Sequence, residues 1–215
     1  MLRRKAQAAK GNVTSELDSL IARDAEGAYE ALQLFRSRAL RFKTKNDPKA
    51  AITAASHGAK SLLKGKFLHA GSELTALLIS ILDESGADLD SETRTIISDI
   101  DSAFEENEGD HAAAAGLRID FLKSCIKWSQ SSGSRELGDP QLHVRLGHCL
   151  WGPEEGKRDI KQSIYHFVAG EAPVAINEKI CATFNSDTLK RDQVRPQRNP
   201  ISSLSPPQRA SPSPF

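Results

Sequence analysis

Apolar residues recur at helical spacing in three successive segments between Ala28 and Leu82. Spacings of three and four residues dominate, and they place the apolar side chains of each segment on one face of a helix. The pattern therefore predicts three consecutive amphipathic helices. The three apolar sets are Ala28, Ala31, Leu32, Phe35, Ala39 and Phe42; Ala51, Ile52, Ala55, Ala59, Leu62 and Leu63; and Phe67, Ala70, Leu74, Leu77, Leu78, Ile81 and Leu82.

The breaks between these segments carry cap and turn residues. Asp47 is expected to cap the second helix, with Pro48 at the first helical position, where its missing N–H costs nothing. Gly65 stands where the second helix must turn into the third, and Gly86 stands where the third must stop. Helices joined by such short turns lie antiparallel, so we expect stacked helical hairpins.

Helical patterns continue on both sides of this core. A first helix is predicted from Thr14-Ser15 to a break at Gly27. After Gly86, Asp88 or Asp90 is expected to cap another helix with an apolar face. That face carries Ile96, Ile97, Ile100, Ala103 and Phe104.

Three further helices are predicted towards the C-terminus. Gly109 is expected to turn the chain into a long helix over residues 111–129, which is apolar on more than one side and should be covered on both faces. Asp139-Pro140 repeats the start signal of Asp47-Pro48. A last amphipathic helix is predicted over residues 157–169. Its buried face is expected to carry Ile160, Ile164, Phe167 and Val168.

These elements predict an all-α fold, a right-handed α-solenoid of stacked helical hairpins. Helix pairs recur about every forty residues, as in a TPR-like solenoid, although the tetratricopeptide consensus is absent. We predict a flexible basic arm over residues 1–13, a solenoid domain over residues 14–180 and a disordered tail over residues 181–215. In the tail, six of the ten prolines alternate with Ser, Arg and Gln, so too little apolar surface is available to offset chain entropy.

Composition narrows the class of protein. Of 215 residues, 27% are charged and 39% are hydrophobic, and the formal net charge is only +1, which argues against a general nucleic-acid binder. No run of about eighteen apolar residues predicts a membrane span, so direct membrane insertion is not expected. Three cysteines without CxxC spacing are typical of a reducing cytosol. The basic N-terminus lacks the apolar region of a secretory signal, while a short organellar presequence stays open.

Candidate catalytic and metal-binding residues are few. His143, His148 and Cys149 are close in sequence, but offsets of five and six residues do not share a helix face as i and i+4 do. A hydrolase that uses one of these residues stays open as an alternative. No GxxxxGK[ST] or GxGxxG sequence supports nucleotide binding. We therefore predict no enzyme, no cofactor and no metal site.

Tyr29 is a candidate binding residue. It stands at the start of the first core helix, and Arg36, seven residues later, lies on a neighbouring face. One interpretation is a half-buried tyrosine that extends its hydroxyl to water. The other is an aromatic anchor beside a charge, the combination that is favoured in interface hot spots.

Six segments together resemble the Golgi to ER traffic protein 4 family, the adaptor of the pathway that targets tail-anchored membrane proteins. They occur in family order at about family spacing, between residues 16 and 180. The segments are AYEALQLFR (28–36), HGAKSLL (57–63), GSEL (71–74), IKWS (126–129), GDPQLH (138–143) and YHF (165–167).

The resemblance implies a non-enzymatic α-solenoid adaptor in the cytosol. Its N-terminal half would dock on the cytosolic targeting ATPase, and its C-terminal half would hold a ubiquitin-like partner. Family residues that face the ATPase correspond here to Tyr29, Arg36 and Glu73, where relatives often carry Asp at the last position. Leu32 replaces a residue that is usually polar.

The resemblance stops after about Ile180, and roughly half of the family's solenoid is missing. The ubiquitin-like partner is therefore not expected to bind. The alternative within the same class is a generic helical-repeat scaffold with an unknown partner.

Overall fold

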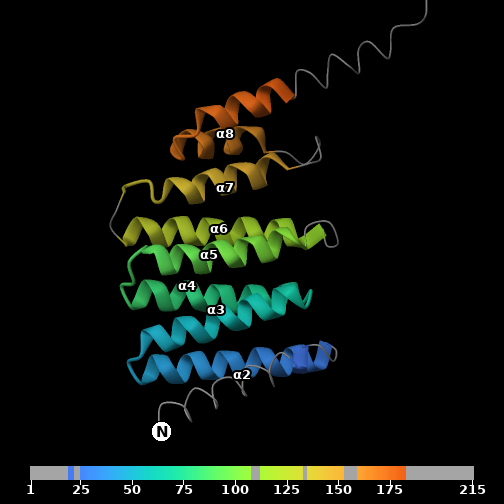
Figure 1. The fold of residues 1–215 in the computed structure, drawn as a ribbon, viewed down its shortest axis with the longest axis vertical. Helices are drawn as coiled ribbons and strands as arrows, with labels where there is room; N and C mark the ends of the chain where they lie inside the picture. Colours follow the sequence, from blue (N-terminus) through green and yellow to red (C-terminus); the bar gives the residue numbers. More distant parts are fainter. Residues whose placement is uncertain (1–18, 22–24, 108–111, 133–134, 153–158, 183–215) are drawn as a thin grey trace, which may run out of the picture. The chain divides into compact units, whose positions relative to one another are not determined.

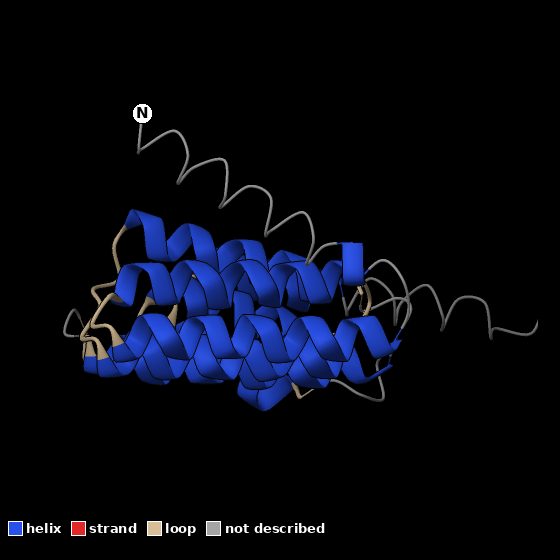
Figure 2. Cartoon of the chain, turned by 90° about the horizontal axis from the view of Figure 1, so that it is seen from below, coloured by secondary structure: helices blue, strands red, loops and turns tan. Residues whose placement is uncertain are grey.

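The computed structural model describes residues 19–21, 25–107, 112–132, 135–152 and 159–182. The chain divides into two compact units, Met1–Pro173 and Val174–Phe215, and in the second unit the described residues 174–182 are helical. Within the described ranges, all regular secondary structure is helical (Figure 2), which confirms the predicted all-α class. The predicted arm and nearly all of the predicted tail lie outside these ranges.

The first unit is a stack of helices, each packed on its neighbours (Figure 1). Contacts join α2 to α3, α3 to α4, α5 to α6, α6 to α7, and α7 to α8. Further contacts join α2 to α4, α3 to α5, and α4 to α6, so each hairpin covers the next one. The helices are α2 Ala25–Thr44, α3 Pro48–Lys64, α4 Leu68–Glu84, α5 Ser91–Glu105, α6 Ala112–Ser131, α7 Pro140–Trp151 and α8 Ile160–Ala169.

Local cap chemistry fixes where several helices begin. The Asp47 carboxylate accepts a hydrogen bond from the Ala50 amide at 3.1 Å, and Pro48 follows as the first helical residue. Asp139 caps α7 in the same way, and of the two candidates for α5 it is Asp90 that accepts from Thr93. The predicted starts of these helices are confirmed. Each start depends only on a side-chain oxygen that accepts a hydrogen bond from the free amides of the first turn.

Glycine allows α2, α3 and α4 to pack closely. A Cβ atom on Gly58 would stand 2.5 Å from Cγ of Phe35 and 2.7 Å from Cδ1 of Leu74. A Cβ atom on Gly71 would stand 2.7 Å from the side chain of Leu63. The side chains of the neighbouring helices therefore occupy the space that a larger residue would need.

Helix α6 is covered on more than one side, as its apolar residues predict, because it packs against α4, α5 and α7. The layer of α5, α6 and α7 also buries charge. The Asp101 carboxylate binds Nε of Arg118 and Nη1 of Arg145, each at 2.7 Å. Arg118 also reaches Glu105 at 3.3 Å.

The structure corrects three predictions. Gly27 does not break a helix, because it lies buried in the first turn of α2 beside Ala28. Helix α8 begins at Ile160 and not at residue 157, because Asp159 caps it by accepting from the amide of Gln162. Of the apolar face predicted for α8, Phe167 is buried, whereas Ile160 and Val168 are 46% and 63% exposed. Ser163 and His166 take buried places in α8.

Among the helices that the structure describes, none has both the length and the apolar character needed to span a membrane.

Candidate functional site

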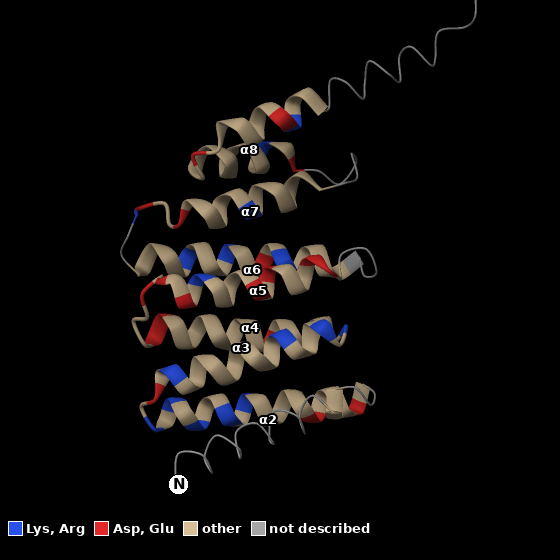
Figure 3. Ribbon diagram, in the orientation of Figure 1, with Lys and Arg blue, Asp and Glu red and all other residues tan. Residues whose placement is uncertain are grey.

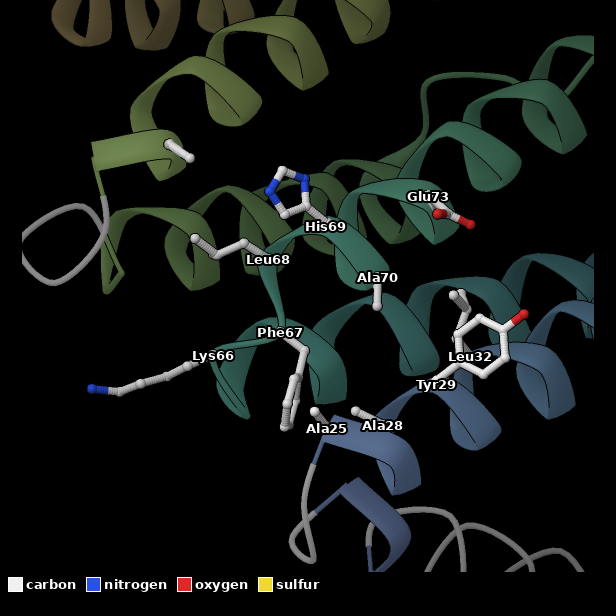
Figure 4. Close-up of a pocket in the computed structure, with 11 residues that line it drawn as sticks. Ala25, Ala28, Tyr29, Leu32, Lys66, Phe67, Leu68, His69, Ala70 and Glu73 are labelled. Carbon is white, nitrogen blue, oxygen red and sulfur yellow. The ribbon is translucent and has the colours of Figure 1, made fainter.

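A groove of about 640 Å³ lies between the N-terminal halves of α2 and α4 (Figure 4), and Ala113 of α6 also lines it. We call it the α2–α4 groove. Much of its lining is apolar, and several of the lining side chains are alanines. The lining residues are Ala25, Ala28, Tyr29, Leu32, Lys66, Phe67, Leu68, His69, Ala70, Glu73 and Ala113.

The small side chains explain why the groove is open. Figure 4 shows Ala25 and Ala28 on α2 and Ala70 on α4, around the middle and one end of the groove. Phe67 stands beside Ala25, and its ring is only partly covered. Three methyl groups cannot fill the space between two helices, so a hollow with apolar walls remains.

Tyr29 forms one wall of the groove and is 63% exposed. Its neighbours Ala28, Ala31 and Leu32 take the buried positions of α2, so the helical period turns the tyrosine ring outwards. The structure therefore disfavours the interpretation of a half-buried tyrosine. A largely exposed aromatic ring at the rim of a hollow is well placed to contact a partner.

Arg36 and Glu73 lie beside this wall and face each other across α2 and α4. Nη1 of Arg36 lies 4.0 Å from Oε2 of Glu73, and the two side chains are 55% and 57% exposed. A pair this open to water contributes at most about 1 kcal/mol to stability. The structure thus brings all three predicted binding residues to one surface, where their charges remain accessible.

The two ends of the groove differ in charge. Glu73 lies near Tyr29 at one end, and Lys66 lies at the other end (Figure 4). Lys66 takes a positive φ of 69° in the turn between α3 and α4. Phe67, the N-cap of α4, offers no side-chain hydrogen bond to the first turn of that helix. A basic end and an acidic end therefore flank an apolar middle.

Beyond the groove, lysine and arginine gather along the C-terminal half of α2 (Figure 3). The Arg38 guanidinium lies 5.9 Å from the centre of the Phe42 ring. Lys43 pairs with Glu84 at 2.5 Å, and hydrogen bonds from Lys43 and Ser80 lower the pKa of the Glu84 carboxyl. The surface along the C-terminal half of α2, from Arg36 onwards, is thus rich in basic residues.

The sequence placed Ala70 on the apolar face of a helix, but it did not predict the hollow. Lys66, Phe67 and His69 were not expected at the site. The only signal was the run of small residues at positions 25, 28 and 70, and its meaning depends on α2 packing beside α4.

His143, His148 and Cys149 do not form a common site. The ring of His143 is buried against His166, at 2.8 Å between the two Nδ1 atoms. His148 is exposed and stacks edge-on with Phe167, and Sγ of Cys149 lies 4.0 Å from the carbonyl oxygen of Ala115. The three side chains therefore serve separate contacts.

The chain is similar in sequence and in structure to known proteins. A family model described as Golgi to ER traffic protein 4 matches residues 45–194. Glu73 falls within the match, Tyr29 and Arg36 precede it, and the match runs past Ile180. A crystal structure of Get4 from "C. therm." superimposes with a TM-score of 0.70 at 25% identity, covering 82% of this chain and 54% of that one.

Two relatives show the same likeness in sequence. Golgi to ER traffic protein 4 homolog of Oryzias latipes is 26% identical over 140 residues, which are 65% of this chain and 40% of the relative. Protein GET4 of Arabidopsis thaliana is 26% identical over 166 residues, covering 67% of this chain and 51% of the relative. The chain spans about half the length of these relatives or less.

Proposed function

Because the chain belongs to the Golgi to ER traffic protein 4 family, we propose that it is a non-enzymatic adaptor in the targeting of tail-anchored membrane proteins to the ER. The adaptor acts in the cytosol and docks on the targeting ATPase through the α2–α4 groove and its rim. The observation that supports this docking site is the convergence of Tyr29, Arg36 and Glu73 on one exposed surface.

The groove offers what a specific protein contact needs. Tyr29 supplies a large, amphipathic ring with few rotatable bonds, and the adjacent hollow has apolar walls. Arg36 and Glu73 add charges at the rim, where they act mainly on the rate of encounter and on partner choice. Tyrosine and arginine are both enriched in the hot spots of protein interfaces.

The alternative is a helical-repeat scaffold that uses the same face for another partner. Catalysis has no support at His143, because its ring is held by His166 and by the carbonyl oxygen of Leu137. That the ubiquitin-like partner does not bind stays a prediction, which a pull-down with that partner checks.

The test is a titration of the targeting ATPase with the full chain, with and without nucleotide. The variant is Tyr29→Ala, and the matched control is Leu34→Ala, an exposed apolar residue of α2 that does not line the groove. Truncating an aromatic anchor should weaken binding by about 2 kcal/mol, roughly thirtyfold, while the control binds as the unmodified chain does.

Helicity and thermal unfolding should be the same in all three proteins, because both side chains are exposed. If Tyr29→Ala and the unmodified chain bound the ATPase with equal affinity, the groove would not be the docking site. Absence of binding by the unmodified chain, in either nucleotide state, would favour the alternative scaffold.

A further inference from the structure

Two histidines join α7 to α8 inside the first unit. Nδ1 of His143 lies 2.8 Å from Nδ1 of His166, and Nε2 of His143 lies 2.8 Å from the carbonyl oxygen of Leu137. The two residues are only 3% and 8% exposed. They come from the GDPQLH and YHF segments, which are 23 residues apart at these positions and meet only in the folded chain.

These contacts fix the proton positions of both neutral rings. A carbonyl oxygen only accepts, so Nε2 of His143 must carry the hydrogen and donate it to Leu137. Nδ1 of His143 is then an acceptor, and Nδ1 of His166 must be the donor. The hydrogen bonds therefore run in one direction, from α8 to α7 and on to the loop before α7.

Among the residues that the structure describes, the charged groups around the pair do not offset an added positive charge. Lys123 of α6 acts electrostatically on His166. Glu171, just after α8, pairs with Arg135 at 2.6 Å. Asp139 at the start of α7 binds Arg94 at 2.5 Å and the first amides of its own helix.

The ring of Tyr165 meets both histidines edge-on, at centroid distances of 6.5 Å and 5.1 Å. A neutral phenol offers no countercharge to an imidazolium. Burial, together with the charges of His143 and Lys123, lowers the pKa of His166 from 6.5 to about 4.

We propose that the His143–His166 pair is a proton-sensitive clasp that holds α8 on α7 when both rings are neutral and releases it when a proton is added. A proton on Nδ1 of His143 sets two N–H donors against each other at 2.8 Å unless His166 changes tautomer. A proton on Nε2 of His166 keeps the bond but places a cation in a buried site near Lys123. Either route weakens the hairpin.

The direction of the pH effect follows from the depressed pKa of His166. When α8 opens, His166 returns towards its ordinary pKa of 6.5, so the open form binds more protons between about pH 4 and pH 6.5. The clasp is therefore at full strength above pH 6.5 and is lost as the pH falls through this window. From pH 7 to pH 5, the opening constant of α8 should rise roughly twentyfold.

The test is amide hydrogen exchange in α8 of the full chain at pH 7 and pH 5, corrected for the intrinsic exchange rate. His166→Gln keeps a side-chain donor but does not titrate, and His69→Gln on the exposed surface of α4 is the matched control. The unmodified chain and the control should show the roughly twentyfold rise, and His166→Gln should change by less than about threefold.

Nitrogen NMR of the imidazole rings at pH 7.5 gives a second readout that needs no variant. The proposal requires a hydrogen on Nε2 of His143 and on Nδ1 of His166, and finding them on the opposite nitrogens would overturn it. An equal pH response in His166→Gln and the unmodified chain would overturn it as well. If His166→Gln does not fold, the tautomers and the pH response of the unmodified chain decide.

Discussion

The α2–α4 region and the α5–α7 layer are built from the same kind of helix but are held together differently. Around α2, α3 and α4, small apolar residues pack closely and the charged side chains lie at the surface. In the α5–α7 layer, Asp101 is 1% exposed and Arg118 is 6% exposed, and they bind each other inside the protein. The first region thus keeps its charges accessible to a partner, whereas the second uses charge to hold its own helices together.

The difference separates residues for binding from residues for folding. Removing an exposed side chain at the groove should change affinity and leave stability intact. Removing a buried charge from the α5–α7 layer should do the reverse, because the buried Arg118 is then left with only the exposed Glu105 as a counterion.

The largest effect is expected for Asp101→Ala. Two arginines from α6 and α7 would lose their shared carboxylate, and the free energy of unfolding should fall by about 3–5 kcal/mol. Asp99→Ala is the control on the same helix, since Asp99 pairs with Lys60 at 2.5 Å but is 46% exposed, and should cost less than about 1 kcal/mol. Denaturant unfolding measures both. Equal losses of unfolding free energy in the two variants would mean that the buried ion pairs contribute no more to stability than the exposed pair does.

A smaller loss of stability is expected for Gly58→Ala in the α2–α4 region. Its new methyl group would overlap Phe35 and Leu74, and overpacking of this kind costs about 1–3 kcal/mol. Gly116→Ala in α6 meets no atom within 4 Å and should instead be neutral or stabilising by up to about 1 kcal/mol. Thermal unfolding of the two variants checks the contrast, which fails if Gly58→Ala is as stable as Gly116→Ala.

The smallest effect on stability is expected for Glu73→Lys. The exposed pair with Arg36 contributes little, so the free energy of unfolding should change by less than about 1 kcal/mol. Association with the targeting ATPase should slow, and its dependence on salt should flatten or reverse, because the charge acts on the encounter. Stopped-flow rates at low and high salt measure this. An unchanged rate at low salt would leave Glu73 as a solvated acid.

The sequence predicted those features that depend on neighbouring residues. Asp47 and Asp139 cap their helices as expected, since a cap needs only the next three amides. The all-α class follows in the same way from the apolar period. The prediction that Gly27 breaks a helix was wrong, because burial among neighbouring residues can stabilise a glycine in the first turn of a helix.

Features that depend on contacts between distant segments could not be predicted from the sequence. The α2–α4 groove depends on how α2 packs beside α4, and neither helix alone shows this arrangement. The pairing of His143 with His166 likewise depends on how α8 folds back onto α7. Tyr29 and Arg36 were indicated by the helical pattern, and the resemblance added Glu73. The packing of α2 beside α4 brings the three residues to one surface.

We expect a partner to cover the α2–α4 groove and not the charged α5–α7 layer. Hydrogen exchange of the full chain, with and without the targeting ATPase, tests this directly. Binding should slow exchange in the first turns of α2 and α4, including the uncapped start of α4 after Phe67, and should leave α7 unchanged. Protection confined to α7 and α8, or absent from both α2 and α4 in a saturated complex, would contradict it.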